Sequence, residues 1–339
     1  MKIYLLADYK GYFGSKYDAI PYRSGFDKNK ISILFSLQGY ECEFVNFNNL
    51  PLFDQLKKFY ILYNSSEDIG DFYKSFIEDI VLHLERNEIK VIPGFDFLKA
   101  HNNKVFMELL RKKLGFSWND TLKSQVFGTL EELEMVIDDI EFPVVIKSFE
   151  GALSRGVFLA HNKSELINKV KMISRVKFLK EDIKDYLRPY KHKGYIKESI
   201  YRKKFVIQQF IPNLINDWKI LVYGKRLYIL TRHIRNNDFR ASGSHCNYLA
   251  GSKSKLPEGI LDFALRVRDG LDVPHVSLDI VYDGAKFHVV EFQTLYFGTS
   301  TFNMSDVFFE KVDSSWKQFK NVLPLEQLYV DGICWFIEK

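Results

Sequence analysis

Short apolar runs alternate with amphipathic stretches over the first hundred residues, and this alternation restricts the fold more than any other feature of the chain. The predicted strands are residues 2–7, 43–45, 60–63 and 90–92, and the predicted helices between them are residues 27–38 and 70–86. Strands that alternate with helices are typical of a parallel sheet covered by helices. Pro93-Gly94 interrupts regular structure. We therefore predict an N-terminal α/β domain over residues 1–95.

The rest of the chain has a different pattern, in which strands follow one another more often. Helices are predicted over 102–114, from Thr129 to about Ile140, and from Asn162 or Ser164 to about Ser174; strands are predicted at 205–207, 219–222, 227–230, 276–282 and 286–292. Thr129 with Glu132 forms a capping-box signature, which marks a helix start. We predict a central lobe over residues 96–205 and a C-terminal lobe over residues 206–339.

Composition excludes several classes of protein. A hydrophobic content of 46% and a charged content of 27% are ordinary for a globular protein. The apolar run at the N-terminus is too short for a signal peptide, and no stretch approaches the length of a membrane span. The three cysteines, Cys42, Cys246 and Cys334, are odd in number and far apart. We therefore expect a reduced, cytoplasmic protein without a disulfide framework, a zinc site or a membrane partner.

Positive charge is concentrated in one segment. The net charge is +5, whereas residues 169–204 hold 13 Lys or Arg against 4 Asp or Glu. One interpretation is a solvated surface, and the other is a basic wall that attracts an anionic ligand. No recognisable nucleic-acid module accompanies the charge, so we do not expect a nucleic-acid partner.

The stretch VVIKSFEGALSRGV, residues 144–157, places a lysine and two glycines between two apolar runs. Lys147 ends the first run, and Gly151 and Gly156 follow it. Glycines let main-chain N–H groups approach phosphate oxygens, and a lysine adds a positive charge. The alternative is an exposed lysine beside a slack hairpin. The pattern is neither a Walker A motif nor a dinucleotide fingerprint, since the second element is a strand.

The longer stretch VVIKSFEGALSRGVFLA resembles the lysine and glycine-rich loop of the ATP-grasp superfamily. It is most like the branch that contains glutathione synthetase and the bacterial enzymes that add glutamate to a ribosomal protein. Four further stretches match in the same order, to about residue 300. The resemblance implies an α/β chain with α+β C-terminal lobes, in which an N-terminal parallel α/β domain precedes the ATP-grasp fold.

The resemblance also implies site residues. The nucleotide-binding residues would be Lys104 in HNNKVFMELLRKKLG, Lys147, Gly151, Ser154, Gly156, Gln209, Phe210, Ile211 and Asp217; the catalytic residues would be Lys219 and Arg240; the metal ligands would be Asp279, Glu291 and Gln293. Three positions depart from the family pattern. Ser154 stands where a third glycine is common, and Ser242 and Gln293 stand where asparagine is usual.

The activity that the resemblance implies is an ATP-dependent, ADP-forming ligation of a carboxylate to an amine through an acyl phosphate. One or two Mg²⁺ ions, with Mn²⁺ as an alternative, would be held by hard oxygen ligands. The substrate would be a small molecule, an amino acid or a peptide, and neither the carboxylate nor the amine is identified. The alternatives are a nucleotide-binding regulatory protein with a degenerate fold and an ATP-grasp kinase. We expect selectivity to be set by residues 11–23 and 169–204, and the oligomeric state stays open.

Several of these residues also have ordinary structural interpretations. Lys104 alone would be an exposed lysine in the first turn of a helix, and Arg232 and Arg235 either lie on the surface or face an acidic substrate. His245-Cys246 has no partner at a spacing that supports nucleophilic catalysis. Asp279 and Glu291 lie within apolar runs, where an unpaired carboxylate is costly.

The strand register gives a test of the metal site. Side chains alternate along a strand, so Glu291 and Gln293 share a face. A two-residue Asp283-Gly284 turn would put Asp279 on the opposite face. A loop centred on Ala285, or a bulge with the same effect, would set Asp279 opposite Glu291. We predict the second arrangement.

Overall fold

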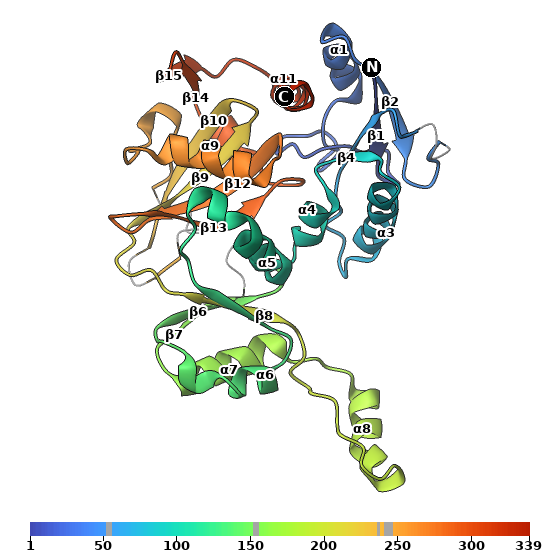
Figure 1. Cartoon of the computed structure of the whole chain (residues 1–339), viewed down its shortest axis with the longest axis vertical. Helices are drawn as coiled ribbons and strands as arrows, with labels where there is room; N and C mark the ends of the chain where they lie inside the picture. The colour runs from blue at the N-terminus through green and yellow to red at the C-terminus, as the bar shows by residue number, and fades with distance from the viewer. Residues whose placement is uncertain (52–55, 152–155, 236–237, 241–246) are drawn as a thin grey trace. The chain divides into compact units, whose positions relative to one another are not determined.

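The computed structural model describes residues 1–51, 56–151, 156–235, 238–240 and 247–339 (Figure 1). The chain divides into two compact units. The first unit comprises Met1–His101, Leu110–Asp120 and Leu214–Lys339, and the second comprises Asn102–Leu109 and Thr121–Asn213. The predicted three-domain boundaries, at 95 and 205, stay predictions. Within the described residues, every helix is too short or too polar to span a bilayer.

The N-terminal part of the first unit is a parallel four-stranded sheet in the order β2-β1-β3-β4. Its strands are β1 (Lys2–Ala7), β2 (Glu41–Asn46), β3 (Tyr60–Tyr63) and β4 (Lys90–Ile92), and its helices are α1 (Lys28–Leu37), α3 (Phe72–Arg86) and α4 (Phe95–Ala100). Alternate side chains of β1 lie on opposite faces of the sheet. Ile3 and Leu5 pack with Phe35 of α1 on one face, and Leu6 packs with Val81 of α3 on the other. A strand buried on both faces is typical of a parallel sheet. The predicted α/β arrangement is confirmed.

The C-terminal part of the first unit is an antiparallel sheet in the order β13-β12-β9-β10-β14-β15, with β11 paired to β10. Its strands are β9 (Asn216–Tyr223), β10 (Arg226–His233), β11 (Leu249–Ala250), β12 (His275–Tyr282), β13 (Phe287–Gln293), β14 (Val307–Val312) and β15 (Ser315–Lys320). The helices are α9 (Ile260–Leu271), α10 (Ser300–Met304) and α11 (Leu325–Glu338), and the short 3-10 turns of this unit are η1 (Gly115–Trp118) and η3 (Gly251–Lys253). Helix α11 packs through Leu328 and Ile333 in one core with Tyr223 of β9 and Leu5 of β1.

The second unit is an antiparallel sheet in the order β5-β8-β6-β7. Its strands are β5 (Ser124–Phe127), β6 (Val144–Ser148), β7 (Val157–Ala160) and β8 (Phe205–Gln209), and its helical segments are α6 (Leu130–Glu134), η2 (Ile137–Asp139), α7 (Lys163–Ser174) and α8 (Leu179–Lys191). Helix α5 (Lys104–Leu114) begins in this unit and ends in the first. Ile146 and Phe205 pack with Val170 of α7. The basic segment 169–204 covers the end of α7, all of α8 and the return to β8, and α8 stands apart from the sheet in Figure 1.

Local signals predicted most helix starts correctly. Thr129 and Glu132 form the predicted capping box, and the Asn162 side chain accepts the N–H of Glu165 to cap α7. The Asn103 side chain accepts the N–H of Phe106 at the start of α5. The predicted helix end near Ile140 is wrong, because α6 ends at Glu134 and Val136 leaves helical geometry at φ −122°. Val136 begins a β-branched pair, and such residues weaken a helix that is not held by packing.

Candidate active site

A buried cluster of charged side chains lies on one face of the C-terminal sheet. Asp217 of β9 and Arg232 of β10 are directly opposite each other in the ladder. The guanidinium donates from Nε to Asp217 Oδ1 at 2.7 Å and from Nη2 to Asp217 Oδ2 at 2.6 Å. Its Nη2 also lies 2.9 Å from Asp279 Oδ2 on β12. One arginine therefore pairs with two carboxylates that are more than sixty residues apart in the sequence.

Lys219 adds a second positive charge to the cluster. It is opposite Asp279 in the ladder, and its Nζ lies 3.6 Å from Asp279 Oδ1. Burial opposes ionisation of Asp279, but Arg232 and Lys219 outweigh it and hold the pKa of this carboxyl at about 2. Burial raises the pKa of Asp217 to about 6, against the pull of Arg232. Asp279 is therefore the more firmly ionised of the two carboxylates.

The register of β12 and β13 sets Asp279 directly opposite Glu291, as predicted. The hairpin turn has Gly284 and Ala285 at its centre, flanked by Asp283, whose N–H donates to the Lys286 carbonyl at 3.1 Å. The Asp283 carboxylate accepts the N–H groups of Ala285 and Lys286, and Gly284 adopts φ +97°. This turn alone would leave the two carboxylates out of register. A bulge beyond Ile280 shifts the ladder by one residue and brings them together.

The three predicted metal ligands fit a divalent cation by the chemistry of their donors. Gln293 shares a face with Glu291 and donates from Nε2 to Glu291 Oε1 at 3.1 Å. Asp279 Oδ1 is buried and makes no hydrogen bond of normal geometry within the described residues, and Lys219 is paired with it only at 3.6 Å, so this oxygen is available to a closer cation. Among the described residues, no group of three or more His, Cys, Asp or Glu side chains could hold a metal by itself. Two carboxylates and one amide would therefore need further oxygen ligands, such as phosphate oxygens.

In the second unit, the start of α5 is joined to the glycine loop. Lys104 donates from its backbone N–H to the Phe149 carbonyl at 2.8 Å and from Nζ to the Gly151 carbonyl at 2.5 Å. The Gly151 N–H donates to the Asn102 side chain at 3.4 Å. Lys104 is thus buried and held at the loop, which corrects the interpretation of an exposed first-turn lysine. Ser154 lies outside the described residues.

Lys147 is buried near the end of β6, opposite Val157 of β7 and Val206 of β8. Gly156 closes the loop, because its carbonyl accepts the Ser148 N–H at 2.9 Å and its φ is +73°. The structure therefore brings Lys104, Lys147 and both described glycines to one loop between two strands. Such a loop can present N–H groups and lysine ammonium groups to an anion.

The adenine-side residues of the prediction follow the end of β8. The Gln209 side chain is exposed and accepts the N–H of Lys123 at 3.4 Å, and Phe210 and Ile211 are half-buried. The preceding residue, Gln208, points the other way and donates to Glu108 of α5 at 3.1 Å in a buried pair. This pair was not predicted from the sequence, although a glutamate flanked by Met107 and Leu109 was a signal for it.

Arg240 is half-exposed and held by its own segment. It donates from Nε to Asp238 Oδ1 at 2.9 Å and from Nη2 to Asp238 Oδ2 at 3.0 Å. This arginine, together with backbone N–H groups, lowers the pKa of Asp238. Ser242 and His245-Cys246 lie outside the described residues. From the sequence, Arg232 was expected either on the surface or facing an acidic substrate. In the structure it is instead buried at the centre of the charged cluster.

A family model described as a RimK-like ATP-grasp domain matches residues 100–305. Among solved structures, the chain is similar to a RimK domain ATP-grasp protein from Sphaerobacter thermophilus DSM 20745, at 15% identity over 98% of this chain and 99% of that chain with a TM-score of 0.50. It is similar to the D-cycloserine synthetase DcsG, at 8% identity over 98% and 99% with a TM-score of 0.54. It is also similar to the macrocyclase MdnC from Microcystis aeruginosa MRC, solved with its precursor peptide MdnA, at 10% identity over 98% and 98% with a TM-score of 0.50. No curated protein sequence matches the chain significantly. These structural likenesses establish the fold.

Proposed function

The chain belongs to the RimK-like ATP-grasp family, and from this membership we propose that it is an ADP-forming ligase that joins a carboxylate to an amine. The observation that carries the proposal is the pairing of Asp279 with Glu291 across β12 and β13, beside Lys219 and Arg232. Two facing carboxylates next to buried cations are suited to an Mg²⁺–phosphate group, whose charges are of both signs.

In the proposed reaction, the substrate carboxylate attacks the γ-phosphorus of ATP, the bond to the β-phosphate oxygen breaks, and ADP leaves. The amine then attacks the acyl carbon and gives up one proton to the departing phosphate or to solvent, and inorganic phosphate leaves with the C–O bond electrons. Lys104 and Lys147 would neutralise phosphate oxygens, and Lys219 and Arg240 would stabilise charge on the reacting groups. Mg²⁺, held by Asp279, Glu291 and Gln293, would supply positive charge at the transferring phosphoryl group.

The remaining family residues would hold the nucleotide and the metal ligands in place. Gly151 and Gly156, with Ser154 between them, would let the loop backbone approach the phosphates, and Gln209, Phe210 and Ile211 would border the adenine. Asp217 would fix Arg232, which in turn orients Asp279. Buried charge pairs of this kind restrict side chains to one geometry, which favours a positioned catalytic group.

The test is ADP release from ATP with Mg²⁺ and a panel of carboxylates and amines, which includes peptides because MdnC was solved with a peptide. We expect ADP release that depends on both substrates. Asp279→Asn and Glu291→Gln should each lower that rate by about a hundredfold or more, since each removes one anionic ligand. Asp313→Asn, an equal charge change at an exposed turn residue, is the control and should leave the rate unchanged.

Two results would contradict the proposal. Nucleotide binding without substrate-dependent ADP release across the panel would favour a degenerate nucleotide-binding protein. A product whose mass equals substrate plus a phosphoryl group, with no amine incorporated, would instead identify a kinase.

A further inference from the structure

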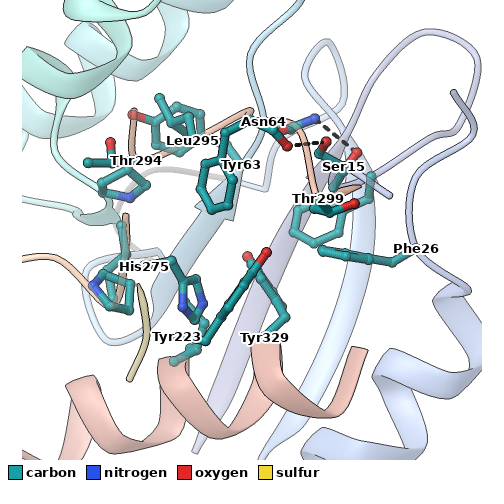
Figure 2. A pocket seen from close by; sticks show the side chains of 17 residues that line it. Ser15, Phe26, Tyr63, Asn64, Tyr223, His275, Thr294, Leu295, Thr299 and Tyr329 are labelled. Carbon is teal, nitrogen blue, oxygen red and sulfur yellow. Dashed lines mark hydrogen bonds between the residues drawn. The ribbon is translucent and has the colours of Figure 1, made fainter. Parts of the chain in front are cut away.

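A pocket in the first unit lies where the loops after β1, β3 and β4 meet the C-terminal sheet and α11 (Figure 2). Gly14, Asn64 and Pro93 contribute from the parallel sheet, and His275 and Tyr329 contribute from β12 and α11. Ligands of α/β sheets bind at the carboxyl ends of the parallel strands. None of the predicted nucleotide or metal residues that the structure describes lines this pocket. It is therefore a separate feature of the fold.

The pocket is small and partly open. It encloses about 480 Å³ of empty space, part of which is open solvent, and about 30 Å³ is reachable by the centre of a water molecule. A bound water needs roughly 10–15 Å³ by this measure, so the enclosed part has room for a few heavy atoms. The enclosed part of the pocket is therefore too small for a nucleotide, but it can hold a terminal group of a larger ligand.

The walls of the pocket are uncharged. None of the 17 residues that line it is Lys, Arg, Asp or Glu, and aromatic rings form much of the surface. His275 is neutral as well, because burial lowers its pKa to about 3. A charged group would lose its hydration here without a counter-charge, which is strongly unfavourable.

Several polar groups of the pocket make no hydrogen bond to the residues that the structure describes. Figure 2 shows the phenol groups of Tyr223 and Tyr329 directed to the same part of the pocket, and no hydrogen bond within the described chain engages either hydroxyl. Burial raises the pKa of both phenols well above the usual value, so both are neutral donors. Thr294 Oγ1 is buried without a hydrogen bond to any described residue. The His275 ring lies against the backbone of Pro274 and Tyr329, whose carbonyls act on its nitrogens. An unsatisfied buried hydroxyl is costly, so Thr294 favours a bound polar group, and the two phenol hydroxyls are available to bind the same group.

The pocket is held in shape by contacts between distant segments. Ser15 donates to the Phe297 carbonyl at 2.8 Å, and the Tyr17 N–H donates to Thr299 Oγ1 at 2.8 Å. Lys16 pairs at 2.8 Å with Glu326, a fully buried residue of α11. Residues 11–23, which were predicted to set selectivity, are thus held by hydrogen bonds and an ion pair to the segment after β13 and to α11.

The pocket and the charged cluster share one face of the sheet. His275, Ser277 and Asp279 alternate along β12 and so point the same way, and their ladder partners on β9 run from Tyr223 to Lys219. Asp279 is four positions along the strand from His275, which is about 13 Å. An extended substrate of about four residues' length would reach from one end to the other.

We propose that this pocket is a specificity subsite that accepts an uncharged, hydrogen-bonding group, such as a primary amide, at the far end of the ligase substrate. That the bound group belongs to a ligase substrate rests on the proposed function. The preference of the pocket for an uncharged group can be tested without measuring catalysis.

The test uses propionamide and propionate, which have the same shape and differ in charge. Binding is followed by NMR through the Thr294 methyl group in the nucleotide-free protein, at concentrations up to about 100 mM, the range suited to ligands of five heavy atoms. We expect saturable shifts with propionamide and at least tenfold weaker binding of propionate. Tyr223→Phe and Tyr329→Phe should each weaken propionamide binding about fivefold, the value of one hydrogen bond.

Tyr228→Phe is the matched control. Tyr228 is fully buried on β10, its hydroxyl makes no hydrogen bond to any described residue, and it does not line the pocket. Propionamide should therefore bind this variant as it binds the unaltered protein. Equal affinity for propionate, the absence of any Thr294 shift, or an equal effect of Tyr228→Phe would overturn the inference. Propionamide binding without ADP release in any assay would retain the subsite and reject the ligase.

Discussion

Arg232 shows how much a single side chain decides in the charged cluster. The residue is 5% exposed, and its guanidinium contacts both Asp217 and Asp279. The sequence offered Arg232 and Arg235 as equivalent candidates, because an isolated arginine near the end of a strand carries no sign of its partner. Pairing across three strands makes Arg232 the buried one, while Arg235 is exposed.

Arg232→Leu should lower the free energy of unfolding by about 3–5 kcal/mol, because it leaves two buried carboxylates with Lys219 as their remaining nearby cation. Arg235→Leu, the same change at an exposed position, should alter it by less than about 0.5 kcal/mol. Urea unfolding of both variants measures the difference. Equal midpoints for the two variants would show that the cluster does not stabilise the first unit.

At the scale of elements, the β12–β13 hairpin depends on both a turn and a bulge. Because side chains alternate between the two faces of a strand, the shared face of Glu291 and Gln293 could be predicted from the sequence. The Asp-Gly pair suggested a different turn, but Asp283 accepts two backbone N–H groups and places Gly284-Ala285 at the centre. The bulge near Val290 then restores the pairing of Asp279 with Glu291. This register places two carboxylates where they could share a metal ion. The register itself is fixed by the pairing of β12 with β13 and β9.

The glycine loop between β6 and β7 permits a direct comparison of two glycines. A Cβ at Gly156 would lie 2.2 Å from Ser148 Oγ, whereas a Cβ at Gly194 would meet nothing within 4 Å; both residues have positive φ, +73° and +83°. Both Gly156→Ala and Gly194→Ala carry the cost of a left-handed backbone, about 1–2 kcal/mol.

Gly156→Ala should lose about 1–3 kcal/mol more than Gly194→Ala, because Ser148 must move away from its contact with the Glu150 carbonyl. Urea unfolding followed by a probe in the second unit measures both. Similar losses for the two variants would mean that the loop adjusts without strain.

At the scale of the whole molecule, the predicted fold class is confirmed: a parallel N-terminal sheet and antiparallel sheets elsewhere, in an ATP-grasp chain. No helix or strand was predicted from the sequence for α9, α11, β14 or β15. Helix α11 is buried on several sides, so its burial depends on what packs around it.

Two buried histidines of the first unit give stability a pH dependence. Burial lowers the pKa of His101 to about 4 and that of His275 to about 3, below the value near 6.5 of an unfolded chain. Between these values the unfolded state binds more protons than the folded state. Stability is therefore complete above about pH 6.5 and falls as pH decreases toward 4, with a slope that approaches about 2.7 kcal/mol per pH unit for the two groups.

Urea unfolding at intervals from pH 7 to pH 4 measures that slope. His101→Gln and His275→Gln should each reduce it by about one proton, and the double variant by about two. Slopes in the variants that equal that of the unaltered protein would show that the rings are solvated in the folded state.

Features that depend on neighbours along the chain could be predicted without a structure. Caps at Thr129 and Asn162, the alternation of strands and helices, and the shared face of Glu291 and Gln293 all follow from local geometry. Tertiary structure alone decided the partners of Arg232 and the assembly of Tyr223, His275 and Tyr329 around one pocket. These contacts join segments far apart in the sequence, and their free energy arises only when packing has excluded water from between them.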